Sequence, residues 1–242
     1  MNLSSFILGP LFLLLSPKYE TIFTDGYNDA LLFIERNAKT INNNLRNENH
    51  EKEIILSVIF PELLRYSYLI DFFQDRAMEI IYIHYGSSVA DFSLGYCQIK
   101  PSFVEKMEDY IRRSSALCNL FADIYTYCVY EGTAIRAERI KRIRSFTWQL
   151  RYLQAFCAIM EERFNDIRWP GLQEKIAFYA SAYNHNFAAS KEHIEYWMKQ
   201  EMYPYGYGYT NNQCSYSQVS LYFYNNNWPQ IKALLNAEIC QK

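Results

Sequence analysis

Residues 51–73 constrain the fold more than any other stretch of this chain. Their apolar positions recur at helical spacing and form a broad, nearly continuous face: Ile54, Ile55, Val58, Ile59, Leu63 and Leu64. A helix that is apolar on most sides has to be covered on most sides, so we predict a central helix. Pro61 removes one backbone hydrogen bond, which predicts a kink or a restart just before Glu62. An acid at this position is costly to bury, and Glu62 is therefore a candidate functional residue.

The rest of the chain also favours helices. The sequence has only 8 Gly and 7 Pro in 242 residues, which argues against a turn-rich sandwich or barrel. Periodicity predicts further helices at 27–48, 75–84, 103–113, 131–144, 145–164, 172–187, 191–200 and 229–239. Residues 219–224 alternate loosely and are predicted to form a short strand. The predicted fold class is mainly α.

The chain divides into three predicted parts. Residues 1–20 contain the apolar run 6–15, which is too short to span a bilayer but suits the core of an export signal. The alternative is a buried segment that closes the core. Residues 21–201 form one helical domain, and residues 202–242 form a small, irregular, Tyr-rich extension packed on it. The tyrosines at 203–209 offer stacking faces for a ligand or, alternatively, belong to a surface loop.

Charge and cysteine usage exclude several classes of function. The net charge is −2, so no overall basic field attracts nucleic acid, and none is expected as a partner. The six cysteines form no C-x-x-C pair and the four histidines do not cluster with them, so we predict no metal site and no cofactor. Buried free thiols are favoured, and disulfides stay open. The basic run at 131–144 is interpreted as a solvated helix face paired with Glu131 and Glu138, rather than as a binding patch.

Three segments, in order, resemble the lytic transglycosylases (SLT type) of the lysozyme superfamily. The first is Ser57-Val-Ile-Phe-Pro-Glu62, similar to the helix that ends in the family's catalytic glutamate. The second, Gly95-Tyr-Cys-Gln-Ile-Lys-Pro-Ser102, resembles the family's Gly-x-x-Gln-Ile-x-Pro segment. The third, Ala182-Tyr183-Asn184, is similar to its late Ala-Tyr-Asn segment. Between them, Arg151-Tyr152-Leu153 resembles the family's Tyr-Leu helix, so the resemblance covers about residues 51–197.

This resemblance implies a lysozyme-like domain that cleaves the MurNAc-GlcNAc bond of peptidoglycan without consuming water. Glu62 would protonate the leaving oxygen and then draw the proton from the C6 hydroxyl of the muramic acid, which closes a 1,6-anhydro ring. Apolar neighbours that raise its pKa would keep Glu62 protonated. Glu79 is a rival for the acid, because its distance from Gly95 in sequence is closer to the family's usual spacing.

The resemblance also implies roles for residues around the acid. Tyr183 would place its hydroxyl near Glu62, and the implied substrate-binding residues are Ser93, Gly95, Tyr96, Gln98 and Asn184. Asp91 would be a second carboxylate only in a hydrolysing muramidase, and we interpret it as a turn cap instead. The expected partner is the peptidoglycan glycan strand. That places the protein in the periplasm or cell envelope, with membrane association through the N-terminus as a further option.

Two alternatives remain open at the level of sequence. Leu63 stands where the family usually has Ser, so one alternative is an inactive glycan-binding or scaffold protein on the same fold. The other is a helical interaction module without a sugar site. The oligomeric state is not predicted.

Overall fold

The computed structural model describes residues 18–45, 51–66, 72–204 and 213–239. The predicted mainly α class is confirmed. The apolar run 6–15, and with it the proposed export signal, lies outside the described residues. Within them the helices are α1 (Tyr19–Arg36), α2 (Ala38–Asn44), α3 (Glu51–Tyr66), α4 (Phe72–Tyr85), α5 (Pro101–Arg113), α6 (Ala122–Tyr125), α7 (Gly132–Arg144), α8 (Phe146–Arg163), α9 (Leu172–Asn184), α10 (Lys191–Trp197), α11 (Tyr216–Asn226) and α12 (Trp228–Ile239).

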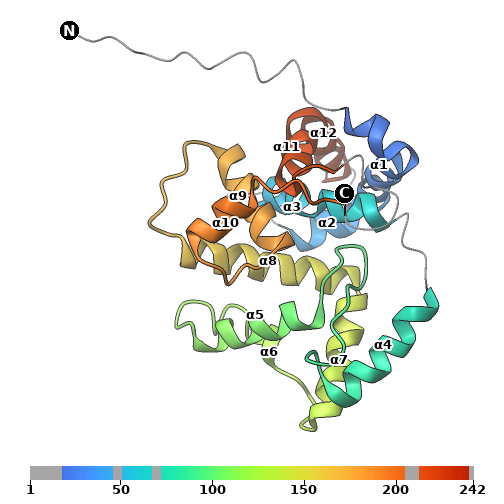
Figure 1. Ribbon diagram of the computed structural model, residues 1–242, viewed down its shortest axis with the longest axis vertical. Helices are drawn as coiled ribbons and strands as arrows, with labels where there is room; N and C mark the ends of the chain where they lie inside the picture. The colour runs from blue at the N-terminus through green and yellow to red at the C-terminus, as the bar shows by residue number, and fades with distance from the viewer. Residues whose placement is uncertain (1–17, 46–50, 67–71, 205–212, 240–242) are drawn as a thin grey trace.

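Helix α8 crosses the middle of the molecule (Figure 1). On one side of it α4 packs on α7, and α5 packs on α6 and α8. On the other side α3 lies among α1, α9 and α11, and α12 contacts α2. None of the described helices is both long and apolar enough to cross a membrane.

Helix α3 is the central helix that its apolar pattern predicts. The side chains from Ile54 to Leu64 are all buried. The predicted restart is wrong, because α3 continues through Pro61 as one helix. Two tyrosine hydroxyls from the C-terminal part of the chain donate hydrogen bonds to backbone carbonyls at and just before Pro61. Tyr216 donates to Val58 O and Tyr203 donates to Pro61 O. These bonds from outside the helix brace its backbone around the proline.

The C-terminal segment, predicted as an irregular extension packed on the domain, forms helices α11 and α12 and contributes side chains to the hydrophobic core. The predicted strand at 219–224 lies inside helix α11. The alternating pattern did not distinguish a strand from a helix. The buried residues Val219 and Phe223 are four positions apart, which places them on one face in either structure. Phe223 stacks on Phe60 of α3, with ring centroids 4.2 Å apart. Residues 205–212, which include most of the tyrosine lobe, lie outside the described residues.

The basic run at 131–144 forms helix α7 as predicted, but its solvated interpretation is wrong for two of its arginines. Arg139 is buried against Glu105 and Glu108 of α5. Arg142 is also buried, and its guanidinium donates to the carbonyls of Asp123, Ile124 and Thr126. Some basic side chains of this run therefore face solvent, and others are buried. The buried ones are paired with groups that lie far away in sequence.

The other predicted helices are confirmed with shifted ends. The predicted helix 27–48 is two helices, because helical structure is interrupted at Asn37. The Asn37 side chain donates to the Phe33 carbonyl at 2.8 Å. The five described cysteines are free, and Cys97 and Cys214 are buried while Cys128 is exposed.

Candidate active site

A tight loop at residues 94–99 forms one wall of the site. Leu94 and Ile99 exchange both backbone hydrogen bonds, each at 3.0 Å. Such a short closure needs left-handed backbone, and Gly95 has φ 68° while Gln98 has φ 52°. The glycine and the glutamine of the recognised segment are therefore the two residues that turn this loop.

Glu62 lies near the end of α3 and faces this loop from a buried position. Its side chain is 7% exposed, and its Oε2 atom has no hydrogen-bond partner among the residues that the structure describes. Arg65, one turn further along α3, places its Nη1 atom 3.6 Å from Oε2, which is an ion-pair distance but longer than a hydrogen bond. The carboxyl group is thus largely removed from water without full compensation.

This environment raises the pKa of Glu62 from 4.5 to about 7. Burial is the largest cause, because it disfavours the charged form. Arg65, the Tyr216 hydroxyl and Lys100 oppose burial and favour the carboxylate, but their combined effect is smaller. The ion pair with Arg65 therefore does not lower the pKa of Glu62 to that of an ordinary glutamate. A carboxyl that titrates near neutral pH can act both as an acid and as a base.

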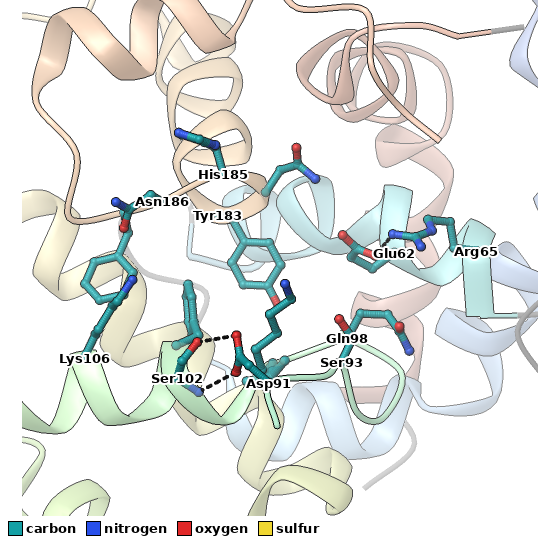
Figure 2. Close-up of a pocket in the computed structure, with 15 residues that line it drawn as sticks. Glu62, Arg65, Asp91, Ser93, Gln98, Ser102, Lys106, Tyr183, His185 and Asn186 are labelled. Atoms are coloured by element: carbon teal, nitrogen blue, oxygen red, sulfur yellow. Dashed lines mark hydrogen bonds and ion pairs between the residues drawn. The ribbon is translucent and has the colours of Figure 1, made fainter. Parts of the chain in front are cut away.

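Glu62 opens into a cleft of about 380 Å³, which Figure 2 shows in close-up. The cleft is lined by Glu62, Arg65, Asp91, Ser93, Gln98, Ile99, Lys100, Ser102, Phe103, Lys106, Tyr183, Asn184, His185, Asn186 and Phe187. Its volume lies within the range of small-molecule sites in proteins. Among the described residues, three cationic side chains line it against two carboxyl groups, and Glu62 is neutral when protonated.

Tyr183 and Asn184 reach the cleft from the C-terminal end of α9. Tyr183 lies between Glu62 and Asn186 in the view of Figure 2. Its hydroxyl donates to the Cys97 carbonyl at 2.6 Å, which ties α9 to the 94–99 loop. Burial raises the pKa of Tyr183 well above its usual range, so this hydroxyl stays protonated. The Asn184 side-chain oxygen accepts from Trp197 Nε1 at 3.3 Å.

The structure brings some of the expected substrate-binding residues to the cleft and leaves others out. Gln98 and Ser93 line it, and the Gln98 amide donates to the Gly95 carbonyl at 2.8 Å. Gly95 does not line it, because its open side faces Gln149 of α8. Tyr96 does not line it either, since its ring packs on Phe33 at 4.2 Å.

The two other carboxylates considered in the sequence differ in position. Glu79 is not part of the cleft lining, and it pairs with Arg144 of α7, whose Nε donates to it at 2.6 Å. Asp91 does line the cleft, but both its oxygens accept hydrogen bonds from Ser102, from the backbone N–H at 3.0 Å and from the hydroxyl at 2.7 Å. Asp91 therefore caps the first turn of α5, whereas the sequence interpretation placed its cap in a turn of its own loop.

Several residues of the site were not identified from the sequence. Lys100 lies inside the recognised second segment, and His185 and Asn186 directly follow the third, so their positions could have been inferred from the motifs. Tyr216 carried no signal of this kind. It begins a helix in a part of the chain that was interpreted as irregular.

The site is thus built from α3, the 94–99 loop, the start of α5 and the end of α9, with Tyr216 of α11 behind the acid. No family model, curated protein or solved structure matches the chain in comparisons with known proteins.

Proposed function

We propose that this protein is a peptidoglycan lytic transglycosylase with a lysozyme-like domain. In this proposal it cleaves the MurNAc-GlcNAc glycosidic bond with Glu62 as its single acid and base. One observation carries the proposal. A carboxyl group with a pKa of about 7, whose Oε2 atom has no hydrogen-bond partner in the described part of the chain, lies at a cleft lined by Gln98 and Tyr183.

The chemistry requires a group that holds a proton near neutral pH and can take one back. The protonated Glu62 would donate to the glycosidic oxygen as the bond to the leaving sugar breaks. The resulting carboxylate would then remove the proton from the muramic acid's C6 hydroxyl as this oxygen bonds to C1. The acid regains its proton, and no water is consumed.

The surroundings of Glu62 support one acid rather than a pair. Asp91 is the other carboxylate of the cleft, and Ser102 occupies both of its oxygens. A hydrolysing muramidase with Asp91 as second carboxylate would have to give up this cap. Gln98 would bind sugar or acetamide groups, and Tyr183, Ser93 and Asn184 would complete the walls.

The experiment is a digestion of purified peptidoglycan, with the products identified by mass spectrometry. The wild-type protein is expected to release 1,6-anhydro-muropeptides, and Glu62→Gln is expected to lower the rate by about 10²–10⁴-fold. Glu79→Gln is the matched control and should retain the activity, because Glu79 is paired with Arg144 outside the cleft.

Other products would assign a different function. Reducing ends in place of anhydro sugars would indicate a muramidase. Glycan binding without cleavage would indicate an inactive binding protein, and the absence of both would contradict the proposal. The substrate also implies export to the periplasm or cell envelope, which detection of the protein in fractionated cells would test.

A further inference from the structure

Tyr216 is a buried residue behind Glu62 that the proposed chemistry has not yet used. It is the first residue of α11, and its hydroxyl donates to the Val58 carbonyl of α3 at 2.9 Å. Val58 lies one helical turn before Glu62, so both residues face the same side of α3. Tyr216 also makes an edge contact with Tyr203, with ring centroids 5.2 Å apart.

The Tyr216 hydroxyl has one hydrogen, which it donates to the Val58 carbonyl, and it also acts electrostatically on the Glu62 carboxyl. The Val58 carbonyl lies inside α3, where helical geometry also directs the backbone N–H of Glu62 at it, so it does not depend on the tyrosine. Within residues 18–45, 51–66, 72–204 and 213–239, the Oε2 atom of Glu62 has no hydrogen-bond partner. The hydroxyl lies near enough to the carboxyl to favour its charged form and to lower its pKa.

We propose that Tyr216 is a positioning residue whose hydroxyl donates to the Val58 carbonyl while Glu62 is protonated and turns to the Glu62 carboxylate once the proton has left. The move requires a rotation of the hydroxyl hydrogen about the phenol C–O bond and an approach of the Glu62 carboxyl group, because the hydroxyl donates to Val58 in this structure. It gives the carboxylate a buried, uncharged donor at the moment when it most needs one.

The other groups that face Glu62 cannot make this exchange in the same way. Arg65 stays 3.6 Å from Oε2, and Lys100 is an exposed side chain. Tyr183 donates to the carbonyl of Cys97, which lies in the 94–99 loop and not inside a helix. The buried Cys97 thiol faces the carboxyl too, and burial raises its pKa, so it adds no charge.

The consequence for catalysis rests on the proposed function, whereas the exchange itself does not. A donor that binds only the ionised form would hold the carboxylate in a fixed position between the two proton transfers. Without it, Glu62 would remain protonated to higher pH and would be a slower base.

The test is a titration of the Glu62 carboxyl carbon by NMR in protein labelled with ¹³C at glutamate carboxyls. In Tyr216→Phe the midpoint is expected to rise by about one pH unit above that of the wild type, because a hydrogen bond to the charged form is lost. Tyr203→Phe is the matched control. It removes a hydroxyl that donates to the α3 carbonyl of Pro61, and should leave the midpoint in place. An unchanged midpoint in Tyr216→Phe, or an equal rise in both variants, would overturn the proposal.

A second measurement does not depend on the folding of Tyr216→Phe. In wild-type protein labelled at the tyrosine ζ carbons, the Tyr216 signal is expected to shift with the same midpoint as Glu62. In Glu62→Gln this shift should disappear, and its persistence would contradict the exchange. Neither experiment needs glycan cleavage. An inactive protein in which both results hold would reject the proposed function and leave this inference standing.

Discussion

Gly95 has no side chain, and the loop beside the cleft depends on this. A Cβ atom there would lie 1.6 Å from Nε2 of Gln149. Gln149 is buried and binds the loop to α8. It accepts from the Cys97 N–H at 3.0 Å and donates to the Ile143 carbonyl at 2.7 Å. The glycine therefore serves the packing of the loop rather than contact with a ligand.

This packing predicts different costs for two glycine substitutions. Both Gly95 and Gly86 have positive φ, but a Cβ at Gly86 would meet nothing within 4 Å. Gly86→Ala should cost about 1–2 kcal/mol from the left-handed backbone alone. Gly95→Ala should cost roughly 2–4 kcal/mol more, because it displaces Gln149 and breaks its hydrogen bonds. Urea denaturation of the two variants measures the difference, and equal costs would show that the close contact relaxes easily.

Glu62 also makes stability depend on pH. Its pKa is about 7 in the folded protein, against 4.5 for a solvent-exposed glutamate carboxyl in an unfolded chain. The folded state therefore holds the proton more tightly. The contribution is fully present below pH 4.5 and is lost as the pH rises through 7. The wild type should lose up to about 3 kcal/mol of unfolding free energy over this range, relative to Glu62→Gln. Parallel slopes for the two proteins between pH 4 and 8 would show that the carboxyl is solvated.

The residues of the cleft were predictable to the extent that they lie in short motifs. Glu62, Gln98 and Tyr183 come from three such motifs and line one cleft. Gly95 was expected at the ligand, but its role depends on Gln149, a partner distant in sequence. Tyr216 could not be predicted, because a buried hydroxyl beside an acid leaves no pattern in its own segment.

At the scale of the element, α7 shows why charge runs are hard to interpret from sequence. Arg139 and Lys141 lie on the same helix, yet Arg139 is buried between two glutamates of α5 while the Lys141 side chain is 80% exposed. Periodicity predicted the helix and its ends. It could not predict the burial, because the hydrogen-bonding partners of Arg139 lie on α4 and α5.

This contrast predicts the outcome of two matched substitutions on α7. Arg139→Met should destabilise the protein by about 3–5 kcal/mol, because it leaves the buried Glu108 carboxylate without its charged partner. Lys141→Met should change stability by less than about 1 kcal/mol, since its ion pair with Glu138 is exposed to water. Thermal or urea unfolding of both variants is the measurement. Similar effects would mean that the α5 carboxylates find other partners.

For the whole molecule, the C-terminal helices decide whether the chain can be divided. The sequence predicted helix α12 but treated everything after residue 201 as an extension, because aromatic, glycine-containing segments are typical of loops. In the structure α11 covers both α3 and α9, the two helices that carry Glu62 and Tyr183. Composition does not reveal which helix covers a central one.

A shortened chain tests this arrangement. A protein that ends at Glu201 is expected to lose cooperative unfolding, because the faces of α3 and α9 that pack on α11 become exposed. A protein that ends at Ile239 keeps both helices and should unfold like the full chain. Circular dichroism during heating distinguishes them. A sharp transition in the shorter protein would restore residues 21–201 as an independent domain.

Tyr216 and Glu62 lie close together in the fold but far apart in the sequence, and this separation has a consequence during synthesis of the chain. A ribosome makes α3 well before α11, the helix that packs on it beside the acid. Until α11 docks, residue 62 is an ordinary carboxylate in water, with an ordinary acidity. In the proposed function, an unfinished or unfolded chain therefore has no protonated Glu62 at neutral pH. Glycan-cleaving activity then requires that α11 has folded onto α3.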